Sequence, residues 1–160
     1  MASRDVQIRR ARASDIPALR DLLQRYYSEG AVEQIDDDAT LIAYTGPSPF
    51  GFNIAEIGDR LVGCVLGRLL TSIPWAIECK RLYVAPEARG RGIAKLLMDS
   101  IENSASAASL RWIYLDSKDN FQTAIALYRH RGYEICERFN DNPEATIFLR
   151  KRLQQSHEGI

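Results

Sequence analysis

The chain has 160 residues, which is enough for one domain that buries most of its surface and too few for two comfortable ones. Hydrophobic residues make up 46% and charged residues 26%, and the 21 basic side chains equal the 21 acidic ones, so no global charge attracts nucleic acid or an anionic membrane. The sequence has neither a signal-peptide core nor a run long enough to cross a bilayer, so we expect a cytoplasmic protein without nucleic-acid or membrane partners.

The N-terminal part predicts a strand and two helices. Val6–Arg10 alternates like a short strand, and Ser14 can cap a helix from about Asp15 to Ser28, where apolar residues recur at three- and four-residue spacing. A weaker helix is predicted over Asp37–Tyr44, before a run of glycine and proline.

Five carboxylates lie within the ten residues Glu29–Asp38, between the two predicted helices. Acidic side chains are stabilised at a helix N-terminus, so one interpretation is a solvated helix start. The other interpretation is a wall that attracts a cationic amine, and the sequence leaves both open.

Strands dominate the middle of the chain. Phe52–Ile57 and Leu61–Leu70 predict a hairpin around a Gly-Asp turn, and Trp75–Val84 follows as the next strand. Arg111–Asp116, reached through a helix, should pair in parallel with Trp75–Val84. The three cysteines lie in predicted strands, and their odd number and wide spacing favour reduced core thiols over disulfides.

The sequence EARGRG, residues 87–92, leads into a helix predicted from about Gly92 to Ala108. Glycine lets the backbone approach a ligand, the first helical amides have no internal partners, and the helix dipole favours an anion, so this loop should hold a phosphate. The alternative is an ordinary connection whose glycines serve only the turn.

Two common phosphate-binding loops are excluded by particular residues. A nucleotide hydrolase has Lys and then Ser or Thr after the last glycine, where this chain has Ile93 and Ala94. The dinucleotide fingerprint requires a third glycine, where this chain has Lys95. The loop at residues 87–92 therefore belongs to neither of these two classes of phosphate-binding loop.

The C-terminal part predicts a helix over Asn120–Arg131 and an antiparallel strand pair, Tyr133–Phe139 and Ala145–Leu153, with fraying after about Leu153. We therefore predict an α+β fold in which residues 1–160 form a single domain. Its mixed sheet should have about seven strands, antiparallel in the N-terminal part with one parallel pair, flanked by about four helices.

Two segments together resemble a known family. The motif R-x-x-G-x-A, Arg89 to Ala94, follows a strand and Pro86, and Ala124–Tyr128 is followed by Gly132-Tyr133. This combination closely resembles the GNAT family of N-acetyltransferases, and the predicted order of elements is similar to that family's fold over nearly the whole chain. The resemblance implies acetyl-CoA as co-substrate, a small amine as acceptor and no metal, and it leaves room for a homodimer.

The resemblance also implies a binding role for particular residues. The amides of Leu82 and Val84 would hold the pantetheine arm like an added strand, and those from Arg89 to Ala94 would cradle the pyrophosphate. Phe121 occupies a slot where family members often have Asn. The implied cofactor-binding residues are Leu82, Tyr83, Val84, Arg89, Gly90, Arg91, Gly92, Ile93, Ala94, Lys95, Asn120 and Phe121.

Acetyl transfer to an amine needs a proton acceptor, because an alkylammonium with a pKa of about 10.4 is only about one part in 10³ neutral at pH 7. Glu78, on the strand before the glycine loop, is the best placed carboxylate, unless it serves as a cross-strand ion-pair partner. Tyr128 matches the family's usual general acid, the alternative being a buried packing position. Full proton transfer from a tyrosine to a thiolate is uphill by roughly 2 kcal/mol, so a donated hydrogen bond can suffice.

We predict direct attack of the amine on acetyl-CoA in a ternary complex, because the sequence offers no well-paired nucleophile for an acyl-enzyme. One alternative is a CoA-binding regulatory module without catalysis, against which the retention of Glu78 and Tyr128 argues. Another is an N-acetyltransferase for proteins or peptides, which would differ in how open the acceptor groove is.

Overall fold

A seven-stranded mixed sheet forms the centre of the computed structural model, which describes residues 5–48 and 50–155. Strands β1 to β4 pair antiparallel in sequence order, β4 and β5 pair in parallel, and β7 pairs antiparallel with both β5 and β6, which confirms the predicted mixed sheet. The strands are β1 (Val6–Arg10), β2 (Phe52–Ile57), β3 (Arg60–Leu69), β4 (Ala76–Val84), β5 (Trp112–Ser117), β6 (Glu134–Ile135) and β7 (Ile147–Arg152). The spatial order is β1-β2-β3-β4-β5-β7-β6. The predicted fraying falls mostly on residues 156–160, outside the described residues.

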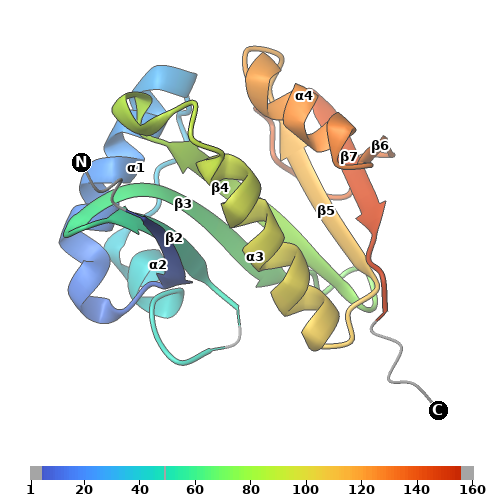
Figure 1. Ribbon diagram of the computed structural model, residues 1–160. Helices are drawn as coiled ribbons and strands as arrows, with labels where there is room; N and C mark the ends of the chain where they lie inside the picture. The colour runs from blue at the N-terminus through green and yellow to red at the C-terminus, as the bar shows by residue number, and fades with distance from the viewer. Residues whose placement is uncertain (1–4, 49, 156–160) are drawn as a thin grey trace.

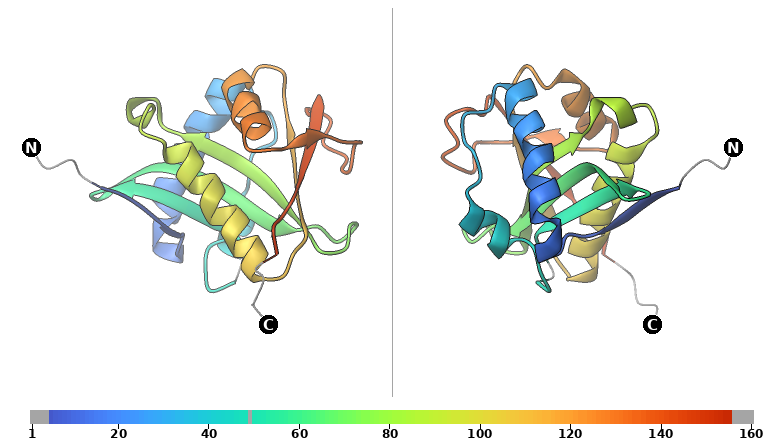
Figure 2. Two further views of the ribbon diagram at one scale, coloured as in Figure 1. Left: turned by 45° about the vertical axis from the view of Figure 1, so that its right-hand side comes forward. Right: turned by 90° about the vertical axis from the view of Figure 1, so that its left-hand side faces the viewer.

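Helices cover both faces of the sheet (Figures 1 and 2). They are α1 (Ile16–Gly30), α2 (Asp38–Ala43), α3 (Ile93–Ala107) and α4 (Gln122–His130). Helix α3 crosses one face, and α1 with α2 lies on the other, so the sheet separates two buried apolar clusters. Among the described residues, no helix is long and apolar enough to cross a membrane.

Helices α1 and α4 begin differently from the prediction. At the start of α1 the side chain of Asp15, and not of Ser14, accepts a backbone hydrogen bond, from the amide of Arg12 at 2.7 Å. Helix α4 begins after the predicted Asn120, because the amide of Phe121 closes a preceding turn by donating to a carbonyl at 3.0 Å.

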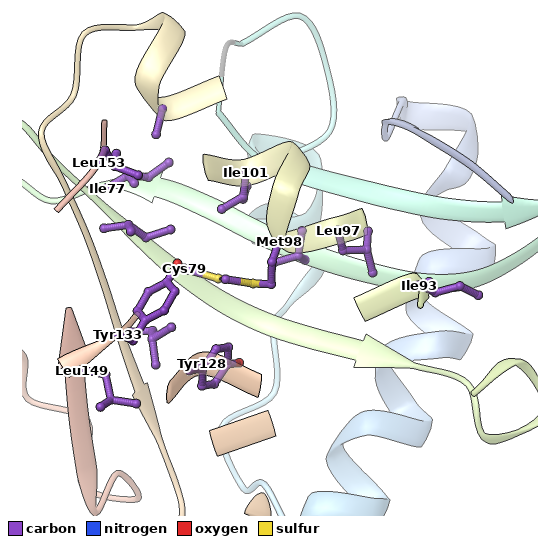
Figure 3. Packing of buried hydrophobic residues seen from close by; sticks show 14 of the residues in the cluster. Ile77, Cys79, Ile93, Leu97, Met98, Ile101, Tyr128, Tyr133, Leu149 and Leu153 are labelled. Carbon is purple, nitrogen blue, oxygen red and sulfur yellow. The ribbon is translucent and has the colours of Figure 1, made fainter. Parts of the chain in front are cut away.

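The face under α3 and α4 is closely packed around β4. Figure 3 shows Cys79 of β4 facing Met98 of α3, with Tyr128 and Tyr133 alongside. The two sulfur atoms of Cys79 and Met98 lie 3.9 Å apart. All three cysteines are free thiols; Cys64 and Cys79 are buried in strands as predicted, whereas Cys136 is only partly buried and follows β6.

A β-bulge interrupts β4 near its end. One residue of β3, Val65, lies opposite two residues of β4, Arg81 and Leu82. Arg81 has φ 60°, a left-handed conformation that is uncommon for a residue with a side chain. A bulge bends a strand and increases its twist, so β4 turns away from β5 beyond Cys79, where their pairing stops.

The last two strands are shorter than predicted. Strand β6 contains only Glu134–Ile135 instead of Tyr133–Phe139, and β7 contains Ile147–Arg152 instead of Ala145–Leu153. Their antiparallel pairing is as expected, but residues 136–146 form a loop.

Asparagine side chains explain the length of this loop. The amide group of Asn140 donates to Glu78 at 2.8 Å and to Asp116 at 2.6 Å, which holds the loop against β4 and β5. The side chain of Asn140 also accepts from the backbone of Asn142 at 3.1 Å. Such local bonds compete with a strand ladder, so the extended pair is replaced by a loop.

Candidate active site

Two adjoining cavities lie where β4 and β5 diverge. The outer cavity, of about 380 Å³, lies between the end of β4, the glycine-rich loop and the start of α4; residues that line it include Tyr83, Val84, Arg89, Gly90, Gly92 and Leu127. The inner cavity, of about 50 Å³, has a more polar wall; residues that line it include Lys80, Arg81, Asp116, Lys118, Tyr128 and Asn142. Four side chains line both cavities: Tyr26, Leu82, Phe121 and Ala124. The two spaces therefore meet at these four residues.

The glycine-rich loop forms one wall of the outer cavity. Gly90 has φ 81° and Gly92 has φ 74°, both in the left-handed region that favours glycine. A Cβ added at either position would meet no other described atom within 4 Å, so the backbone conformation, and not crowding, calls for glycine. Gly92 directly precedes α3, whose unpaired amides and dipole make this wall suitable for an anion.

An arginine stands at the rim of the outer cavity. Arg89 pairs with Glu29 at 2.7 Å, and its Nε donates to the carbonyl of Val84 at 3.0 Å. The hydroxyl of Tyr83 donates to Glu29 at 2.7 Å. This hydrogen bond lowers the pKa of Glu29, while burial and the same bond raise the pKa of Tyr83 to about 12. The rim thus holds a cation that is paired with a carboxylate.

The inner cavity contains one end of a network of charged side chains. Lys80 lies 3.4 Å from Asp116 and 3.7 Å from Glu78, and Asn140 donates to both carboxylates. Arg68 donates to the remaining oxygen of Glu78 at 2.8 Å. Glu78 is only 1% exposed and lines neither cavity, whereas Asp116 lines the inner one. The geometry of Glu78 is that of the ion-pair alternative. Asp116 and Glu144 are the described carboxylates that line the inner cavity, and Glu144 accepts a hydrogen bond from the amide of Glu33.

Tyr128 brings a hydroxyl group to the inner cavity from α4. The residue is buried, and its ring centre lies 5.7 Å from that of Tyr133 (Figure 3). Burial raises the pKa of Tyr128 well above its ordinary value, so the hydroxyl stays protonated at neutral and mildly alkaline pH. This side chain can donate a hydrogen bond there.

The acidic run between α1 and α2 has structural partners. Asp37 caps α2 by accepting from the amide of Thr40 at 2.8 Å, as the helix-start interpretation predicted. Asp36 pairs with Arg81 at 2.9 Å and so holds the bulge, and Asp38 pairs with an arginine of α1. None of these three carboxylates lines either cavity, and Glu29, which lines the outer one, pairs with Arg89, so no described carboxylate of the run lines the inner cavity.

Most of the predicted cofactor-binding residues line the outer cavity. They are Leu82, Tyr83, Val84, Arg89, Gly90, Gly92, Ile93, Ala94, Asn120 and Phe121. Arg91 and Lys95 are exposed and line neither cavity. For Lys95 the reason is helical geometry, since each residue of α3 points about 100° away from the one before it.

The sequence reasoning missed residues that distant segments bring to the cavities. Asp116 lies one residue before the end of β5, which pairs in parallel with β4 as predicted, and ligands bind where parallel strands end, so the sequence carried a signal for it. Tyr26 belongs to the apolar stripe of α1 and gave no separate signal. Asn142 lies between the two predicted C-terminal strands, and only the fold brings its side chain to Asp116, at 3.4 Å.

The outer cavity offers backbone amides that can bind an anion, and the inner cavity offers side chains that can donate or accept a proton. A group-transfer enzyme with a phosphate-bearing donor requires both. A family model described as the acetyltransferase (GNAT) family matches residues 16–133. The chain therefore belongs to the GNAT acetyltransferase family, and it is an acyltransferase.

Individual proteins support this assignment. An uncharacterised N-acetyltransferase of Schizosaccharomyces pombe is 31% identical over 150 residues, which cover 89% of this chain and 90% of that protein. A GNAT-family acetyltransferase from Staphylococcus aureus has a TM-score of 0.82 at 19% identity, covering 94% of this chain and 100% of that one. An N-acetylglutamate synthase from Neisseria gonorrhoeae, complexed with coenzyme A and N-acetyl-glutamate, has a TM-score of 0.78 at 19% identity over 96% of this chain and 36% of its own. The two structures share the fold.

Proposed function

We propose that this protein transfers the acetyl group of acetyl-CoA to the amine of a small or amino-acid-like molecule, by direct attack in a ternary complex. The observation that carries the proposal is the pair of adjoining cavities, with anion-binding amides at one end and a tyrosine and a carboxylate at the other. Membership of the acetyltransferase family and the coenzyme A bound to the Neisseria gonorrhoeae structure support the same donor.

The donor would lie along the outer cavity. Its pyrophosphate would accept hydrogen bonds from the amides between Arg89 and Ala94, and Arg89 could exchange Glu29 for a phosphate. The pantetheine arm would run along Leu82–Val84, next to the edge of β4 from which β5 has diverged, and bond to it as an added strand does. The thioester would then reach the junction between the cavities.

The amine nitrogen of the acceptor would enter the inner cavity, whose small volume favours a small amine over a peptide. Contacts between loops that are distant in the sequence further restrict access to the inner cavity. The amide of Glu33 donates to Glu144 at 2.7 Å, and the amino group of Lys118 donates to the carbonyl of Ala31 at 2.8 Å. A peptide acceptor would require these loops to separate.

Asp116 is our candidate for the group that receives the acceptor's proton, directly or through a water molecule. The ammonium form of the acceptor first loses one proton to solvent. The neutral nitrogen then attacks the thioester carbon and becomes strongly acidic as the C–N bond forms, so a carboxylate can take its second proton at that stage. Lys80 and Asn140 hold Asp116 in place, and Glu78 lies behind them as the second anion of the network.

Tyr128 would stabilise the leaving sulfur as the C–S bond breaks. Burial raises its pKa further above that of a thiol, so complete proton transfer costs more than roughly 2 kcal/mol. The phenol therefore donates a hydrogen bond to the thiolate, and solvent protonates the released CoA.

The test is release of CoA thiol from acetyl-CoA in the presence of a panel of small primary amines. We expect saturable, amine-dependent release. Cys64 and Cys79 are buried, whereas Cys136 is a partly exposed free thiol, so the same protein with acetyl-CoA and no amine serves as the background control. CoA binding without release by any amine would contradict catalysis, and release only with peptides would contradict the small acceptor.

A further inference from the structure

Two aromatic rings form much of the junction between the outer and inner cavities. Tyr26 of α1 and Phe121, just before α4, line both cavities, together with Leu82 and Ala124. The two rings are stacked, with centres 5.9 Å apart and planes 10° from parallel. Any group that passes from the outer to the inner cavity must therefore fit beside this pair.

Neighbouring groups hold both rings in position. The backbone of Phe121 donates to a turn carbonyl at 3.0 Å and accepts from Ile125 at 2.9 Å. A Cβ added at Gly30 would lie 2.2 Å from Cζ of Phe121, so the ring occupies space that only glycine leaves. Tyr26 makes an edge contact with Tyr83 at 5.8 Å. The stack is a built constriction with little freedom to widen.

The volume behind the constriction limits what can pass. At about 50 Å³, the inner cavity has room for roughly four water-sized groups of about 10–15 Å³ each. An acetyl group has three heavy atoms, and the attacking nitrogen is a fourth. Each further methylene of a longer acyl chain would have to displace the acceptor or push the rings apart, and overpacking of this kind is costly.

We infer that the stacked pair Tyr26–Phe121 makes the protein selective for acetyl over longer acyl groups. The inference rests on the proposed function, because it requires an acyl-CoA whose thioester reaches the junction. It gives Phe121 a role in acyl-chain selection at a position where the family often has Asn.

Calorimetric titration with free CoA, acetyl-CoA and butanoyl-CoA tests the inference without an acceptor. The wild-type protein should bind acetyl-CoA more tightly than butanoyl-CoA by about tenfold or more, the usual effect of extra methylenes against a fitted wall. In Phe121→Ala the ratio should fall to within about threefold, mainly because butanoyl-CoA binds more tightly. An unchanged ratio in a folded variant that still binds CoA would overturn the inference.

Further variants separate the possible causes. Leu127→Ala, which lines only the outer cavity, should weaken all three ligands alike and leave the ratio unchanged. Tyr26→Ala should lower the ratio of the affinity for acetyl-CoA to that for butanoyl-CoA, whereas Tyr26→Phe, which keeps the ring, should preserve it. These two variants test the inference if Phe121→Ala fails to fold. Wild-type protein that binds no CoA would contradict the proposed function, whereas equal binding of the two acyl-CoAs would contradict the selectivity alone.

Discussion

The outer cavity is built largely by backbone, whereas the inner cavity is built by side chains from distant segments. Gly90 and Gly92 shape the loop of the outer cavity within a few residues of each other. In the network beside the inner cavity, Asn140 donates to Asp116, 24 residues away in the chain, and to Glu78, 62 residues away. We therefore expect donor binding to depend on local conformation and catalysis to depend on long-range packing, so variants of the two regions should fail in different ways.

The largest effect is expected in the inner cavity, for Tyr128→Phe. The change removes only the hydroxyl, so packing and CoA affinity should survive while kcat falls by about 10² to 10⁴. Steady-state kinetics with the best amine of the panel measures this. Because burial raises the pKa of Tyr128, the wild-type rate should show no fall from its ionisation up to about pH 10.

Tyr133→Phe is the matched control for Tyr128→Phe. Tyr133 is an equally buried neighbour whose hydroxyl lies 3.4 Å from Glu102, and it lines neither cavity. A Tyr128→Phe enzyme with kcat within about threefold of wild type, when chemistry is rate-limiting, would mean that the tyrosine serves packing.

In the outer cavity, Gly92→Asp should weaken CoA binding by about 10² or more, because it adds bulk and negative charge where the pyrophosphate is proposed to lie. Calorimetry with CoA measures the loss. Gly132→Asp is the control, since Gly132 also has a left-handed φ, of 95°, and open space around it but lies outside both cavities. Binding by Gly92→Asp within twofold of wild type would contradict the loop assignment.

A pair of variants separates the two carboxylates of the inner network. Asp116→Asn should lower kcat by about 10², because it removes the proposed proton acceptor. Glu78→Gln should lower the free energy of unfolding by about 1–3 kcal/mol, since it leaves Arg68 without its anion and Lys80 with Asp116 alone, and should reduce kcat less. Kinetics together with denaturant unfolding distinguishes the two roles. A larger fall in kcat for Glu78→Gln than for Asp116→Asn would indicate that Glu78 is the proton acceptor.

The smallest expected effect is a gain in affinity for CoA. Glu29→Gln removes the charge that competes with phosphate for Arg89, so CoA should bind about two- to fivefold more tightly at low salt, with the gain fading at high salt. Glu87→Gln is the control, because Glu87 pairs with Arg25 and Arg60 near the loop but lines neither cavity. Weaker or unchanged binding by Glu29→Gln would show that Glu29 does not compete.

The same division explains how much could be predicted from the sequence. The order of strands and helices and the glycine loop follow from local patterns, and the structure has them nearly as predicted. The bulge at Arg81 could not be predicted, because the residue with the left-handed conformation is an arginine and not a glycine. Its conformation is held by an ion pair with Asp36, which lies in another part of the chain. Likewise Glu78 appeared the best placed carboxylate in sequence, yet packing turns it toward Arg68 and leaves Asp116 at the cavity.

A crystal structure with acetyl-CoA bound tests the central claim most directly. We expect the pyrophosphate to lie against the amides from Arg89 to Ala94, the pantetheine arm to run along Leu82–Val84, and the acetyl group to lie past the Tyr26–Phe121 stack, with the thioester sulfur within hydrogen-bonding distance of Tyr128. A ligand whose phosphates lie away from this loop, or whose acetyl group stays in the outer cavity away from Tyr128, would contradict it.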